Sequence, residues 1–177
     1  GYFSENIASN VFPAGQNQEL ALGTAAMYLN GSWLPNEVKN MAGDDFQWGC
    51  FSYPAVEGGT DGTEAANYGG QVLAINKNSQ HAEDAFKLIT YITKGEFDKK
   101  LSEESLGIPS DTTNSEWPVQ LTDVKPVMES LKTRYPWAAG AEDNVDMTPI
   151  IKENMTKLCS GAITADEFVS NLQAAGK

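Results

Sequence analysis

Histidine and cysteine, which supply most nucleophiles, bases and zinc ligands, are scarce in this sequence. His81 is the single histidine, and Cys50 and Cys159 are the only cysteines. A Cys–His nucleophile or a zinc site needs several such side chains close together, and the sequence offers no such grouping. We expect His81 to be an exposed bystander in the first turn of a helix. The two distant cysteines favour two free, partly buried thiols, with a single disulfide as the alternative.

Carboxylates are abundant, and their number alone does not exclude the acid and nucleophile pair of a glycosidase. Adjacent acidic residues occur at 44–45, 103–104 and 142–143, each in a polar context that would not raise a pKa. The acidic run over 142–146 lacks the ligand spacing of a calcium-binding loop, and no glycine-rich phosphate-binding motif is present. We therefore predict a protein that is not an enzyme and holds neither a cofactor nor a metal ion.

Tryptophan is the remaining side chain with a clear binding chemistry. Trp33 follows the Gly31-Ser32 turn directly, and the other tryptophans are at positions 48, 117 and 137. A tryptophan where the chain turns outward can present a flat apolar face while its indole N–H donates a hydrogen bond. The C–H face and hydroxyl rim of a pyranose match that surface. Core packing is the competing interpretation for each tryptophan.

The charge balance excludes two classes of partner. Twelve Lys and Arg residues against twenty-four Asp and Glu residues give a net charge of −12. Such a surface repels nucleic-acid phosphates and anionic lipid headgroups, so we expect neither as a partner. The longest aliphatic run, 72–75, is far too short to span a bilayer, and the composition is that of a soluble globular protein.

Apolar runs and turn residues predict three strands and three helices. Strands are expected at 24–30, 46–53 and 71–76, with an exposed glycine-rich loop over 55–70. A helix with apolar residues from 82 to 92 follows a cap at Ser79 and ends at Lys94-Gly95. A second helix runs from 148 to Gly161, and a capping box at 164–167 opens a third. Strands among helices indicate an α/β fold.

Several of these segments together resemble the carbohydrate-binding extracellular solute-binding proteins, the group that contains the maltose-binding protein. The segment 23–33, GTAAMYLNGSW, is similar to the family's G-x-x-A-M-x-x-x-G-x-W stretch. Five further segments resemble family elements in the expected order: the strand ending at Pro54, the Gly69-Gly70 pair before 71–75, the helix over 82–92, the turn at 106–109 and the closing segment 161–168.

The resemblance implies a two-lobed periplasmic-binding-protein fold that closes on its ligand by a hinge and is then recognised by the permease of an ABC importer. Residues 1–68 and 114–177 would form most of the second, carboxy-terminal lobe. Residues 69–113 would be a strand–helix segment of the first lobe, whose amino-terminal remainder the chain lacks. The resemblance also implies an extracytoplasmic location, periplasmic or lipid-anchored on the cell surface.

By position in the resemblance, the expected ligand-binding residues are Ser32, Trp33, Tyr68, Gly69, Gly70 and Trp137. Trp33 corresponds to the family's stacking aromatic, and Tyr68 and Gly70 correspond to positions near the hinge. The expected ligand is a sugar or short oligosaccharide. A binding protein for a polyamine or an amino-acid derivative is the first alternative, and a glycosidase the second. Because 69–113 would lack its lobe partner, we also expect self-association of the fragment, exchange of this segment between copies, or its repacking onto the second lobe.

Overall fold

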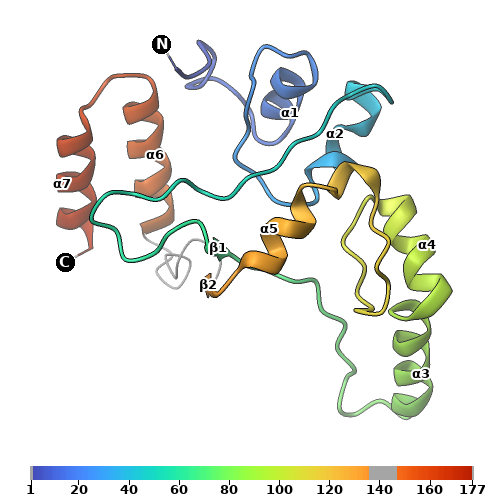
Figure 1. Cartoon of the computed structure of the whole chain (residues 1–177). Helices are drawn as coiled ribbons and strands as arrows, with labels where there is room; N and C mark the ends of the chain where they lie inside the picture. Colours follow the sequence, from blue (N-terminus) through green and yellow to red (C-terminus); the bar gives the residue numbers. More distant parts are fainter. Residues whose placement is uncertain (1, 136–146, 177) are drawn as a thin grey trace. The chain divides into compact units, whose positions relative to one another are not determined.

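The computed structural model describes residues 2–135 and 147–176 of the chain (Figure 1). These residues are mostly helical and divide into two compact units, Gly1–Tyr28 with Tyr135–Lys177, and Leu29–Arg134. The first unit holds α1 (Ala14–Ala21), α6 (Met147–Cys159) and α7 (Ala165–Ala175). The second holds α2 (Leu34–Ala42), β1 (Ala65–Asn67), α3 (Ala82–Ile92), α4 (Gly95–Ser105), the 3₁₀-helix η1 (Val119–Leu121) and α5 (Val124–Ser130); β2 (Thr133–Tyr135) spans the boundary.

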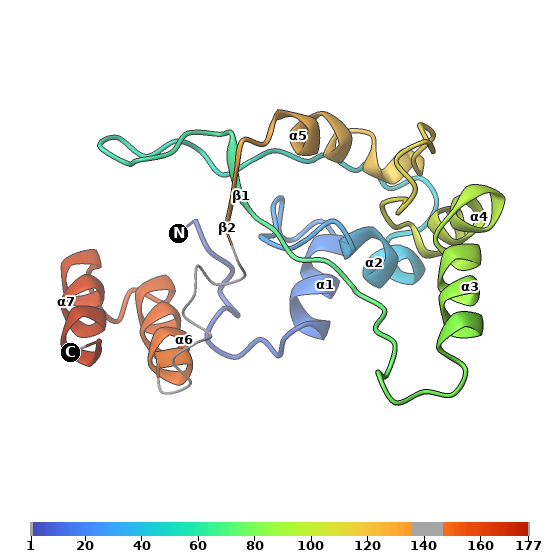
Figure 2. The same ribbon diagram turned by 90° about the horizontal axis from the view of Figure 1, so that it is seen from below.

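Helices α6 and α7 pack side by side in the first unit (Figures 1 and 2). Gly161, at φ +76°, follows the end of α6 and lets the chain reverse. The predicted capping box is confirmed: Thr164 Oγ1 accepts the Glu167 N–H at 3.2 Å, and the Glu167 carboxylate accepts the Thr164 N–H at 2.8 Å. The Asn171 amide donates to Asn154 Oδ1 at 2.8 Å and ties the two helices together.

The second unit is organised around a few buried apolar side chains. Leu34 and Val38 are buried one turn apart on α2, which has Pro35 in its first turn. Leu121 of η1 and Val124 of α5 are also buried. Strands β1 and β2 form a two-stranded sheet, and the N–H groups of Lys132 and Thr133 both donate to the Glu64 carbonyl at its edge.

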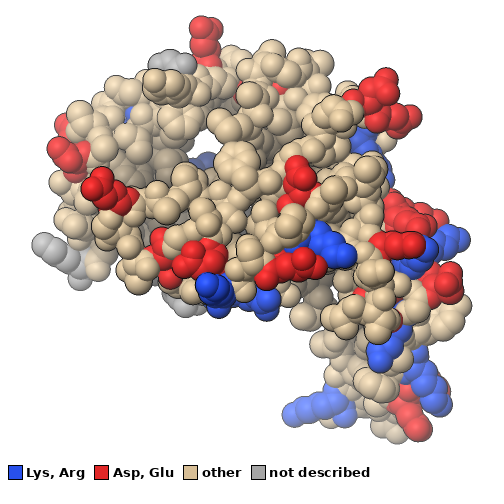
Figure 3. Space-filling view, in the orientation of Figure 1, with Lys and Arg blue, Asp and Glu red and all other residues tan. Residues whose placement is uncertain are grey.

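Helices α3 and α4 form a helical corner whose outer faces carry intermixed basic and acidic side chains (Figure 3). The predicted helix over 82–92 is confirmed as α3, although His81 and not Ser79 is its N-cap residue; the Ser79 hydroxyl instead accepts the His81 N–H. His81 is exposed, as expected. Gly95, at φ +62°, interrupts the helical conformation where a helix end was predicted, and it is also the first residue of α4.

The three predicted strands are wrong. Residues 24–30, 46–53 and 71–76 have no regular secondary structure, and the α/β expectation is corrected to a mostly helical fold with one small sheet. A strand exists only when a neighbouring strand pairs with its N–H and C=O groups, and an apolar run does not supply that partner. The predicted loop over 55–70 is mainly irregular but contains β1.

No helix in the described ranges is both long and apolar enough to cross a bilayer.

Candidate ligand-binding surface

Trp33 lies where the irregular segment after α1 turns into α2. It is the N-cap residue of that helix, and its side chain is 46% exposed. The indole lies against the backbone of Gly31, so closely that a Cβ at Gly31 would collide with ring carbons Cε3, Cζ3 and Cη2. The Asn30 side-chain oxygen accepts the Gly31 N–H at 2.7 Å and holds the turn. Glycine at position 31 therefore sets the position of the indole.

Ser32, beside Trp33, is half-buried at the same turn. Tyr68, Gly69 and Gly70 form a second exposed group directly after β1. Nothing lies within 4 Å of a Cβ built on Gly69 or Gly70, so the backbone there is open to approach by another molecule. Both groups belong to the second unit. Trp137, the remaining predicted site residue, lies outside the described residues.

Sequence reasoning missed Arg134, which the structure places against Tyr68. The guanidinium carbon of Arg134 lies 5.1 Å from the centroid of the Tyr68 ring, within the range of a cation–π contact. Arg134 is on β2 and Tyr68 follows β1, so strand pairing brings the two side chains together. One feature of the sequence could have pointed to this residue: Arg134 is the only arginine of the chain.

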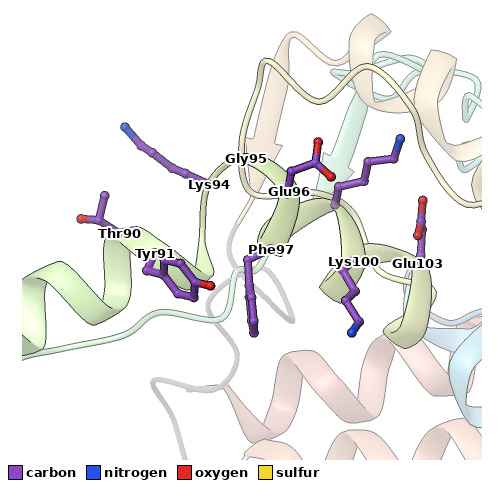
Figure 4. Close-up of a pocket in the computed structure, with 9 residues that line it drawn as sticks. Thr90, Tyr91, Lys94, Gly95, Glu96, Phe97, Lys100 and Glu103 are labelled. Atoms are coloured by element: carbon purple, nitrogen blue, oxygen red, sulfur yellow. The ribbon is translucent and has the colours of Figure 1, made fainter.

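An open hollow of about 780 Å³ lies at the corner between α3 and α4 (Figure 4). Tyr91 and Phe97 pack beside it with ring centroids 5.1 Å apart. Two of its lysines are already engaged, Lys99 with Glu116 and Lys100 with Glu104. Its lining is Thr90, Tyr91, Lys94, Gly95, Glu96, Phe97, Lys99, Lys100 and Glu103. Mixed, paired charges on an open surface do not form a specific pocket for a small neutral solute.

The described carboxyl groups whose pKa values depart from the ordinary range are all lowered. A hydrogen bond from Ser4, then one from Asn6, lowers the pKa of Glu19, and hydrogen bonding to Lys99 lowers that of Glu116. A glycosidase acid requires the opposite shift, because it must keep its proton near neutral pH. These groups are therefore unsuited to the acid role in glycoside cleavage.

The described residues give little support for a reactive cysteine or a metal-binding site. Cys50 and Cys159 are both free, and desolvation, followed by the charge of Asp123, raises the pKa of the Cys50 thiol. A raised pKa disfavours the thiolate, which is the reactive form. Within residues 2–135 and 147–176, no three His, Cys, Asp or Glu side chains gather as a metal site.

Comparison with known proteins gives one match. No curated protein and no solved structure matches the chain. The family model described as bacterial extracellular solute-binding protein matches residues 6–96, just over half of the chain. That range contains the Gly31–Trp33 turn, the Tyr68–Gly70 group and α3. The chain therefore belongs to the bacterial extracellular solute-binding protein family, whose members are the non-enzymatic substrate-binding components of ABC transporters.

Proposed function

We propose that the solute bound by this protein is a sugar or short oligosaccharide. The observation that carries the proposal is Trp33: a large aromatic ring at the start of a helix, nearly half exposed and seated on a glycine. A soluble protein exposes so large an apolar ring at a structured turn at a cost, and a pyranose C–H face covers it well. Ser32 beside it supplies a hydroxyl for the sugar rim.

The second group, Tyr68 with Gly69 and Gly70, supports the same proposal. Tyr68 is 46% exposed and offers another aromatic face with a hydroxyl. The two glycines leave room for the backbone to approach a ligand closely. Trp137 remains a proposed member of the site on the family resemblance alone. No cofactor is invoked, since stacking and hydrogen bonds suffice to hold a sugar.

In this proposal Ser32, Trp33 and Tyr68 belong to the second lobe of a two-lobed protein, formed by 1–68 and 114–177, while Gly69 and Gly70 lie at the start of 69–113, which belongs to the first lobe. Exposed apolar side chains in 69–113 support this division: Val72 is 86% exposed and Phe86 63%. The closed, ligand-bound form would be recognised by ABC permease subunits. Family membership implies an extracytoplasmic location, and attachment by a lipid or retention in the periplasm is part of the proposal.

A cationic solute such as a polyamine is the alternative within the same family. Its binding would need carboxylates around the aromatic faces. The experiment that separates the two is isothermal titration of the protein with neutral mono-, di- and trisaccharides and, in parallel, with spermidine and amino acids. We expect heat from at least one saccharide and none from spermidine. Binding of spermidine alone would contradict the proposal.

A further inference from the structure

Arg134 is held in one place by the sheet and by Tyr68. The Glu64 carbonyl accepts the N–H groups of Lys132 and Thr133 at 2.9 and 3.2 Å, which fixes β2 beside β1 (Figure 1). The Arg134 guanidinium then lies over the Tyr68 ring. A guanidinium resting on an aromatic face keeps its N–H donors at its edge, and these remain free for a planar acceptor.

Arg134 has no carboxylate partner among the described residues, although acidic residues outnumber basic ones two to one. The four ion pairs of the described ranges all use lysine. Glu64, directly before β1, directs its carboxylate toward Gly62, where a Cβ would lie 2.7 Å from Oε2. Among the described residues, this exposed arginine is thus left without a carboxylate partner, although the chain is strongly acidic.

This arrangement suits one class of ligand group. A guanidinium presents a fork of N–H donors that matches the two oxygens of a carboxylate, and such pairs are stronger than neutral hydrogen bonds. The net charge of −12 repels anions at long range. At physiological salt this field is screened beyond about 8 Å. A cation in direct contact with an anionic ligand can therefore still bind it. The aromatic ring of Tyr68 adds a face for the sugar ring itself.

We propose that Arg134 and Tyr68 form a subsite that binds the carboxylate of an acidic sugar, a uronic-acid residue, with Arg134 pairing the carboxylate and Tyr68 contacting the ring. This inference rests on the proposed function, because it specifies which sugars the protein takes. It makes Arg134 a specificity-determining residue.

The test is isothermal titration with three matched sets of disaccharides: galacturonate- and glucuronate-containing disaccharides, their methyl esters, and the corresponding neutral disaccharides. We expect at least one acidic disaccharide to bind, and its methyl ester to bind roughly ten- to hundredfold more weakly. Arg134→Gln should produce a loss of the same size, and Arg134→Lys a smaller one. Lys132→Gln, which removes an exposed cation two residues away, should leave the affinity within about twofold. Circular dichroism of each variant reports whether the fold is kept.

Two outcomes overturn the inference in distinguishable ways. Binding of neutral disaccharides that is unchanged in Arg134→Gln would refute the acidic subsite while the proposed sugar-binding function stands. Absence of binding by all three sets would refute both.

Discussion

The side-chain amide of Asn114 donates to the carboxylate of Asp98 on α4, with 2.8 Å between Nδ2 and Oδ2. Asp98 is 2% exposed, and its carboxylate also accepts the N–H groups of Ser110 and Asp111 at 2.9 and 3.1 Å. A buried carboxylate is tolerated when its oxygens are hydrogen-bonded in this way. Asp98 is therefore a main attachment of the irregular segment 107–114 to α4.

Asp98→Ala should destabilise the protein, because three donors would lose their acceptor at once. We expect the free energy of unfolding to fall by about 3 kcal/mol, measured by urea denaturation. Asp84→Ala is the control, since Asp84 is exposed and forms a surface ion pair with Lys87 on the same helix. Equal stability of the two variants would show that Asp98 does not anchor the segment.

Asp111 should make the same segment sensitive to acid. The Gly95 N–H, then the Thr113 hydroxyl and N–H, lower the pKa of Asp111 from 3.8 to about 2. Because the folded-state pKa is the lower one, this stabilisation is complete above about pH 4 and is lost as the pH falls through 2. A ¹³C carboxyl titration by NMR should show a midpoint near 2, and Thr113→Val should raise it. A midpoint near 3.8 in both proteins would contradict the contacts.

Gly31→Ala should displace the Trp33 indole, because the new methyl group would occupy the position of the ring. We expect a shift in tryptophan emission and weaker saccharide binding with little change in unfolding midpoint. Gly49→Ala is the matched control, since its Cβ would meet only Asp123 Oδ2 at an ordinary 3.7 Å. Unchanged emission and affinity in Gly31→Ala would mean that Gly31 does not position the ring.

Self-association is expected through α3, which has no buried residue in the described structure. Phe86 and Leu88 are 63% and 60% exposed, and a surface of this kind is usually covered by another surface. Light scattering over a concentration series should show a mass above 19.1 kDa that falls toward it in Phe86→Asp. Phe51→Asp, a similarly exposed phenylalanine outside α3, should have no such effect. A strictly monomeric protein would argue against assigning 69–113 to the other lobe.

Helices with strong local signals were predictable from the sequence. α3 and α6 have apolar residues at helical spacing, and Thr164 with Glu167 defines the start of α7 without reference to the rest of the chain. α2 was not predicted, although Leu34, Val38 and Met41 follow helical spacing and Pro35 is in its first turn. The apolar run before it was interpreted as a strand instead. α4, rich in charge, and α1, which has little apolar periodicity, gave weaker signals.

The three strand predictions were wrong because pairing is a tertiary property. Val72 and Leu73 form an apolar run, but no strand among the described residues pairs with them, and both are exposed. The Arg134–Tyr68 contact was unpredictable for the same reason. It depends on the pairing of β1 with β2, and the two residues lie 66 positions apart in the sequence, so no local pattern reveals it. Trp33, by contrast, was predictable as a candidate binding residue, because the Gly31-Ser32 turn directly before it is a local feature of the sequence.

Trp33→Ala is the most direct test of the central claim that this protein binds sugar on an exposed aromatic face. Met41→Ala is the matched control, because Met41 belongs to α2 and is also 46% exposed. In isothermal titration with the tightest-binding saccharide, Trp33→Ala should weaken binding by roughly 1–3 kcal/mol, and Met41→Ala by less than about 0.5 kcal/mol. Saccharide affinity that is the same in wild type and Trp33→Ala would contradict the claim.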